Sequence, residues 1–302
     1  MHCKPTMSLL TPPITFIFGG LFIAFSLVGT ISNVIVLKIL RRPLFKTQTN
    51  RILASLVLAN IFEGLIAAPI SAWQLFSRFA ITNCYIDFLR RYIIVSLTGT
   101  SLLSLVIIAF DRCILLTRLN DYESFMTRRN CLLLVTFAWI CPAVIPCLAF
   151  LGRHLYLAVA LLVTLGSFVA LILSFYFIKR AVKKHNEIML KHQREATLYE
   201  NTINNRYKEQ QRRELVHVKL SRLVSLLIIT NFCSMLLSNI WILVNIVETN
   251  YPVMNLKNSQ LFYLVSLAMV LTNPCINPFI LFSKHPEIKR ELYDSIQQWK
   301  GH

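Results

Sequence analysis

Long apolar stretches separated by short polar ones organise the whole chain. Seven of these stretches reach the ~20 residues that an α-helix needs to cross ~30 Å of hydrocarbon. The pattern therefore predicts an all-α membrane protein with a seven-transmembrane helix bundle in a single domain, residues 1–302. The predicted spans are Ile14–Leu40, Arg51–Phe76, Tyr85–Thr117, Cys131–Leu151, Leu155–Ile178, Leu220–Val247 and Leu261–Phe282.

The polar segments between the spans predict three further features. Residues 1–13 form a short extracellular N-terminus, and the first span is expected to be an anchor rather than a cleaved leader. Residues 179–219 form a third cytoplasmic loop that extends the flanking helices and breaks near 201–205. Residues 284–302 alternate apolar and charged positions, which predicts an amphipathic helix along the inner membrane surface followed by a tail.

Charge is distributed unequally between alternate loops. Of 31 basic residues, the side that carries the N-terminus holds only six: Lys4, Arg78, Arg90, Arg91, Arg153 and Lys257. The positive-inside rule then places the N-terminus outside and the C-terminus in the cytosol, and we expect the plasma membrane. Because the cations gather at helix ends, the net charge of +17 indicates contact with membrane lipid rather than nucleic acid.

Most of the cysteines belong to the apolar spans, and few lie on the predicted extracellular side. Six of the eight cysteines lie in or beside apolar spans and are most simply explained by packing. Only Cys3 and Cys84 fall clearly on the outside, so a disulfide between them is one possibility.

Most of the apolar spans carry one or a few polar or otherwise distinctive residues. They include Asn33, the segment Leu56–Asn60 with Pro69, Asp111–Arg112–Cys113, Trp139, and the run Asn273–Leu281. An amide in lipid is costly unless it faces the bundle and finds a partner. We therefore expect a buried polar network formed by Asn33, Asn60, Ser101, Asn273 and Asn277.

In their order and spacing, these marks resemble the rhodopsin-like class of G-protein-coupled receptors over essentially the full chain. The resemblance implies an extracellular ligand, a heterotrimeric G protein as partner, no cofactor or metal, and no enzymatic activity. It further implies that Asp111 restrains Arg112 at rest, that Tyr176 leans toward Arg112 in the active state, and that Asn277 and Pro278 take part in the switch.

Several residues depart from the family pattern. Asn60 replaces the acid that holds a sodium ion, so sodium is not expected to affect agonist binding. Span 6 reads Met235–Ser238 in place of the kinked tryptophan–proline motif, and Leu281 replaces the closing tyrosine. The expected acidic partner of Arg112 in helix 6 is missing from residues 217–220, which predicts raised basal activity.

The outer part of the bundle carries ligand-pocket candidates: Glu63, Asp87, Arg90, Arg91 and Ile94. Ile94 stands where amine receptors have an acid, which disfavours an amine ligand. The shortened connection near Gly152 suggests an open mouth, and the missing exterior bridge and helix 5 proline are similar to the melanocortin, lysophospholipid and cannabinoid branch.

Arg90 matches the phosphate-binding arginine of lysophospholipid receptors, so an anionic or lipid-like ligand is one hypothesis. The alternative is that Asp87 pairs with Arg90 or Arg91 within the helix. Glu63 is either a ligand counter-ion or proton sensor, or a structural partner of helix 3 or 7.

Other protein classes fit less well. Residues 259–282 contain no lysine for a retinal Schiff base, which argues against an opsin. Internal repeats typical of transporters and motifs typical of membrane hydrolases are also missing. A receptor-like protein that binds a ligand or dimerises without activating G proteins remains the main alternative.

Overall fold

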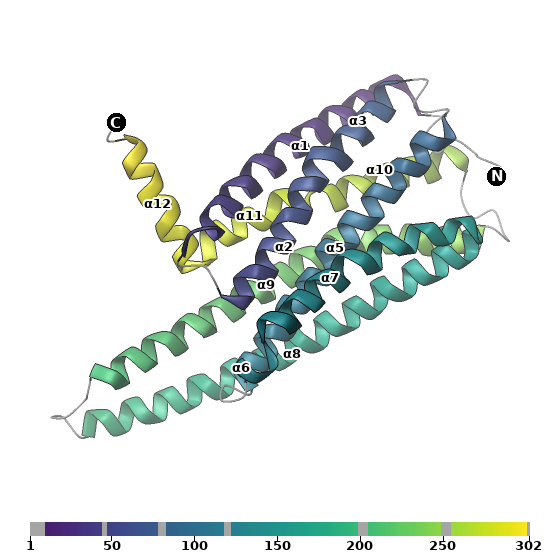
Figure 1. The fold of residues 1–302 in the computed structure, drawn as a ribbon. Coiled ribbons are helices and arrows are strands. Elements are labelled where there is room, and N and C mark those ends of the chain that lie inside the picture. Colours follow the sequence, from purple (N-terminus) through teal and green to yellow (C-terminus); the bar gives the residue numbers. More distant parts are fainter. Residues whose placement is uncertain are drawn as a thin grey trace.

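The computed structural model describes residues 10–43, 47–77, 83–117, 122–198, 205–248 and 255–300. These ranges contain seven helices that are long and apolar enough to span a membrane: Pro12–Leu40, Gln48–Phe76, Cys84–Thr117, Arg128–Phe150, His154–Lys183, Leu220–Val247 and Lys257–Lys284. The predicted all-helical bundle with a short C-terminal helix is therefore confirmed, and its helices run side by side in Figure 1.

The first three spans are built from five elements. Helix α1 covers Pro12–Leu40, and α5 covers Cys84–Thr117. The second span is divided into α2 (Gln48–Phe62), a π-helical turn η2 (Glu63–Ala67) and α3 (Ala68–Phe76).

The π-turn brings helices α1 and η2 unusually close. Pro69 lies in the first turn of α3 and has no backbone N–H, so one intrahelical hydrogen bond of span 2 is missing here. The irregular π-turn lies directly before it. The Ser26 hydroxyl donates to the carbonyl of Gly64 at 2.7 Å. A Cβ on Gly64 would lie 2.6 Å from the Thr30 hydroxyl, so only glycine fits this approach.

The middle of the chain contains α6 (Tyr122–Phe125), α7 (Arg128–Val144), the 3₁₀ segment η4 (Ile145–Phe150) and α8 (Arg153–Leu198). Only Leu151 and Gly152 separate η4 from α8, so this connection is as short as predicted. Helices α8 and α9 (Asn205–Glu248) both continue beyond the end of the bundle (Figure 1).

The last span is divided into α10 (Leu256–Leu271) and α11 (Asn273–Lys284), and α12 (Pro286–Lys300) follows it. Helix α12 turns away from the bundle axis in Figure 1. The buried side chain of Ile288 and an ion pair between Arg42 and Glu291 fasten it to the bundle.

Two apolar clusters fill the interior. The larger joins α1, α2, α5, α7, α8, α9 and α11, and the smaller joins α1, α3, α5 and α10. Large apolar side chains also cover the outer surface, including Phe16 at 66% and Leu162 at 70% exposure. Water would disfavour such a surface, whereas lipid accommodates it, so the helices are built to face hydrocarbon.

Candidate functional site

A buried carboxylate at one end of α5 gathers partners from two other segments. Asp111 accepts hydrogen bonds from the Thr49 hydroxyl at 2.8 Å and the Tyr122 hydroxyl at 2.6 Å. The nearest Arg112 nitrogen lies farther away, at 3.5 Å from a carboxylate oxygen. Asp111 is therefore held mainly by two hydroxyls, and its neighbouring arginine is held only weakly.

Tyr122 sits on α6, in the connection between spans 3 and 4. Burial, together with the negative charge of Asp111, raises the pKa of this phenol. It therefore remains protonated and able to donate to Asp111 across the pH range of cells.

His285 lies between α11 and α12, close enough to Arg112 to sense its charge. Burial, aided by the positive charge of Arg112, lowers the pKa of this imidazole to about 4. Its Nδ1 accepts a hydrogen bond from the Ile288 amide at 3.4 Å, which caps the start of α12. The neutral imidazole is thus the form that accepts this hydrogen bond at the start of α12.

Tyr176 does not join this group. Its side chain is 58% exposed and packs against Phe177, with ring centroids 5.8 Å apart. Within the described residues it forms no hydrogen bond to Arg112, so its proposed active-state contact requires rearrangement. The side chains of residues 217–219, where the expected acidic partner of Arg112 is missing from the sequence, lie outside the described ones.

Three of the five predicted network residues lie together at the centre of the bundle. The Asn33 amide donates to the carbonyls of Gly29 at 2.7 Å and Pro274 at 2.6 Å. Asn60 donates to Asn33 at 3.5 Å and accepts from Ser101 at 3.0 Å. This chain of amides connects helices α1, α2, α5 and α11 through neutral groups alone.

The other two network residues are placed differently from the prediction. Asn273 accepts a hydrogen bond from the Ser234 hydroxyl at 2.7 Å, which ties α11 to α9. Asn277 is buried, but its side-chain oxygen has no hydrogen-bond partner among the described residues. Pro278 lies inside α11, also buried. The five residues therefore form two separate polar contacts and one unsatisfied group.

Near the opposite end of α5, Asp87 holds two arginines. It accepts from Arg90 at 2.7 Å and pairs with Arg91 at 2.5 Å. Arg90 also donates to the Tyr263 hydroxyl at 2.5 Å and is fully buried. Its guanidinium lies 5.3 Å from the centre of the Tyr263 ring. Both terminal nitrogens of Arg90 are therefore occupied by partners inside the protein.

Glu63 begins the π-turn of span 2 and is 1% exposed. Its carboxyl accepts a hydrogen bond from the Thr98 hydroxyl at 3.0 Å. No cationic side chain in the described ranges forms an ion pair with it. Glu63 thus has a partner on α5, which is the structural role considered for it.

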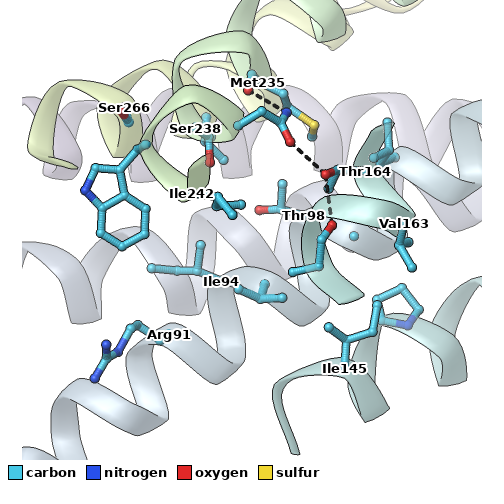
Figure 2. A pocket seen from close by; sticks show the side chains of 18 of the residues that line it. Arg91, Ile94, Thr98, Ile145, Val163, Thr164, Met235, Ser238, Ile242 and Ser266 are labelled. Atoms are coloured by element: carbon cyan, nitrogen blue, oxygen red, sulfur yellow. Dashed lines mark hydrogen bonds between the residues drawn. The ribbon is translucent and has the colours of Figure 1, made fainter. Parts of the chain in front are cut away.

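A cavity of about 140 Å³ lies between α5, η4, α8, α9 and α10. Its wall is mostly apolar, and Figure 2 shows Ile94, Ile145, Val163 and Ile242 facing it together with several neutral polar side chains. The Thr164 hydroxyl donates to Asn239 at 2.7 Å, and Asn239 donates to the Met235 carbonyl at 2.9 Å.

The charged candidates stand mostly outside this cavity. Arg91 is on its edge and Ile94 forms part of its wall, whereas Glu63, Asp87 and Arg90 do not line it. Thr98 lines it and connects it to Glu63. The Trp241 indole nitrogen is buried at the wall without a hydrogen-bond partner among the described residues.

Cysteine placement bears on the predicted bridge. Cys84 is disulfide-bonded at the start of α5, and the other six described cysteines are free. The predicted partner, Cys3, lies outside the described residues.

Sequence reasoning missed several residues of these sites: Thr49, Tyr122, Ser234, Asn239, Tyr263 and His285. Most reach their partners across large separations, such as the 173 positions between Arg90 and Tyr263. For Tyr122 one signal was available, because a tyrosine 11 positions after a buried aspartate can return to it through a short turn.

Comparison with known proteins finds a family match in the first part of the chain. Residues 32–156 match the family model described as 7 transmembrane receptor (rhodopsin family). A stretch of 142 residues, 45% of the chain, is 25% identical to the neuromedin-U receptor 2 of Mus musculus. Another of 124 residues, 39% of the chain, is 29% identical to the trace amine-associated receptor 365 of Petromyzon marinus.

These matches cover only 34% and 32% of the two relatives' lengths. Neither relative is named as a melanocortin, lysophospholipid or cannabinoid receptor, so that branch stays a prediction. The matching family is one of receptors and not of enzymes. Seven membrane-length helices and the match over residues 32–156 together make this chain a multi-pass membrane protein similar to rhodopsin-family receptors.

Proposed function

We propose that the protein is a rhodopsin-like G-protein-coupled receptor of the plasma membrane, with its N-terminus outside. The weak hold on Arg112 carries the proposal. Asp111 prefers the hydroxyls of Thr49 and Tyr122, so Arg112 leaves its position without stranding a buried carboxylate. An arginine released in this way helps form the surface that receives a G-protein α subunit when helix α9 moves outward.

The cavity between α5, η4, α8, α9 and α10 is the proposed ligand site. Its apolar wall favours a mainly apolar, lipid-like ligand, and the polar groups of Thr98, Thr164 and Asn239 favour one neutral hydrogen-bonding group on it. The hypothesis of an anionic ligand held by Arg90 loses its support, because Asp87 and Tyr263 already bind both of its terminal nitrogens and Arg90 does not line the cavity.

Nucleotide exchange on a panel of purified Gα subunits tests the function. The full chain in lipid nanodiscs is expected to accelerate exchange on at least one Gα above empty nanodiscs, and Arg112→Ala is expected to abolish the acceleration. Lys289→Ala, an exposed change on α12, serves as the control and should retain it. Should a folded receptor leave every Gα unaffected with and without ligand libraries, the proposal fails.

One observation favours the alternative of a ligand-binding protein without G-protein activation. Helix α9 is continuous from Asn205 to Glu248 and contains no proline to weaken its backbone. Ligand binding at the cavity without nucleotide exchange on any Gα would establish that alternative.

A further inference from the structure

A second hollow lies far from the proposed ligand cavity, in the seam between α8 and α9. Its volume is about 660 Å³, and the described residues that line it all belong to these two helices. It sits where both helices leave the membrane-length segments, which end at Lys183 and begin at Leu220. We propose that this seam is a binding site for an anionic phospholipid of the cytoplasmic leaflet.

The apolar part of the seam suits an acyl chain. Ile178 and Val182 are buried at its base, Phe175 and Leu226 are half-buried, and Ile229 is 47% exposed. Phe175 and Ile229 lie within the membrane-length segments, toward the bilayer interior. The chain of a lipid reaches these positions from the bilayer itself.

Three cations surround the cytoplasmic part of the same seam. Lys179, Lys183 and Arg222 are exposed, and none forms an ion pair with another described side chain. Lys179 rests 4.5 Å from the centre of the Phe175 ring, which positions its ammonium at the junction between the apolar and cationic parts. Glu187 is the one acid among the described residues that line the seam. The surplus of positive charge matches the phosphate and carboxylate groups of an anionic headgroup.

An acidic protein surface is a less suitable occupant. Such a surface meets Lys183 and Arg222 from the cytosol, but it does not reach Ile229 within the hydrocarbon layer. The cations lie at headgroup depth and the apolar groove lies beneath them. An anionic phospholipid fits both, because its headgroup is negatively charged and its acyl chains are apolar. The site requires the predicted orientation in the bilayer but does not depend on G-protein coupling.

Competition binding in neutral detergent micelles tests the site on the full chain. The probe is a fluorescent phosphatidylserine, displaced by unlabelled phosphatidylserine or phosphatidylcholine. Each Lys or Arg beside an anionic headgroup raises the binding affinity by a factor of about five. The triple variant K179Q/K183Q/R222Q is therefore expected to bind phosphatidylserine about 100-fold more weakly. Phosphatidylcholine is expected to displace the probe poorly from the unmodified protein.

Arg180→Gln is the matched control, because Arg180 is exposed on the same helix but does not line the seam. It is expected to leave affinity within about twofold, as expected for a remote surface charge. The triple variant binding as tightly as the control would overturn the proposal. So would equal displacement by glycerophosphoserine, which carries the headgroup without acyl chains.

A second variant separates the apolar part of the site from the charged part. Ser225 lines the seam and is half-buried, so Ser225→Trp fills the groove while keeping all three cations. It is expected to lower phosphatidylserine affinity at least tenfold. Unchanged affinity, or tight binding of an acidic peptide that Ser225→Trp leaves intact, would identify a charged surface for another partner and contradict a lipid site.

Discussion

Helix α5 carries two buried Asp–Arg pairs, one near each end, and they are built on opposite plans. At the outer pair, near the start of α5 and on the side predicted to be extracellular, Asp87 accepts from Arg90 at 2.7 Å, and the Tyr263 hydroxyl accepts from the same arginine at 2.5 Å. At the inner pair, Arg112 stays 3.5 Å from Asp111, whose oxygens are taken by Thr49 and Tyr122. The same two residue types thus form a tight ion pair at one end of α5, here called the outer or fixed joint. At the other end they form a loose pair that can separate, here called the inner joint.

The largest expected effect comes from breaking the outer joint. Arg90→Met leaves Asp87 buried with one of its two cations lost, and removing one partner of a buried pair costs about 3–5 kcal/mol. We expect strongly reduced surface expression and a markedly lower melting temperature in detergent. Arg91→Gln, whose side chain is 40% exposed, is the control and should cost at most about 1 kcal/mol. Equal melting temperatures for Arg90→Met and the unmodified protein would refute the fixed-joint interpretation.

Acidification is expected to act on the inner end through His285. Its pKa is about 4 in the folded protein and 6.5 in a model peptide, so the unfolded chain binds the proton more tightly. The stability contribution is therefore complete above pH 6.5 and is lost as the pH falls toward 4, by up to roughly 3 kcal/mol.

Thermal melting between pH 7.5 and 4.5 measures this loss. His285→Asn keeps a hydrogen-bond acceptor for the Ile288 amide and does not titrate, so its melting temperature should fall less over the same range. Identical pH profiles for the two proteins would show that His285 is not the group responsible.

A smaller effect is expected from loosening the inner joint directly. Tyr122→Phe removes one of the two hydroxyls on Asp111 and costs about 1–2 kcal/mol. Asp111 then has a free oxygen with which to draw Arg112 closer, so we expect lower ligand-independent nucleotide exchange. Tyr85→Phe is the control, because Tyr85 is 87% exposed and lies at the opposite end of α5 from this pair. Increased exchange in Tyr122→Phe would instead mean that Tyr122 restrains the active state.

The smallest expected effect is that of sodium. The central network of Asn33, Asn60 and Ser101 consists of neutral groups and provides no carboxylate for a cation. Replacing sodium with an organic cation at constant ionic strength should leave basal exchange and melting temperature unchanged. A reproducible shift in either quantity would require a sodium site elsewhere in the bundle.

The sequence was sufficient for features that depend on local spacing. Hydropathy and length located the spans, and the separations of three and four residues already suggested that Asp87 pairs with Arg90 or Arg91. It was insufficient where a partner comes from a distant helix. Tyr263 on Arg90, Ser234 on Asn273 and Thr98 on Glu63 depend on how the helices are rotated against one another, which composition does not specify.

The two-residue connection between η4 and α8 has a kinetic consequence. A long connection at this place folds over the mouth of a bundle and slows the escape of whatever lies inside it. Leu151 and Gly152 are too few to do so, and they leave the cavity without cover from this segment. Because this segment does not slow dissociation, we expect short ligand residence times at the proposed site. Affinity would then be limited mainly by the dissociation rate. Occupancy of the proposed ligand site would then follow changes in ligand concentration closely and end soon after the ligand is removed.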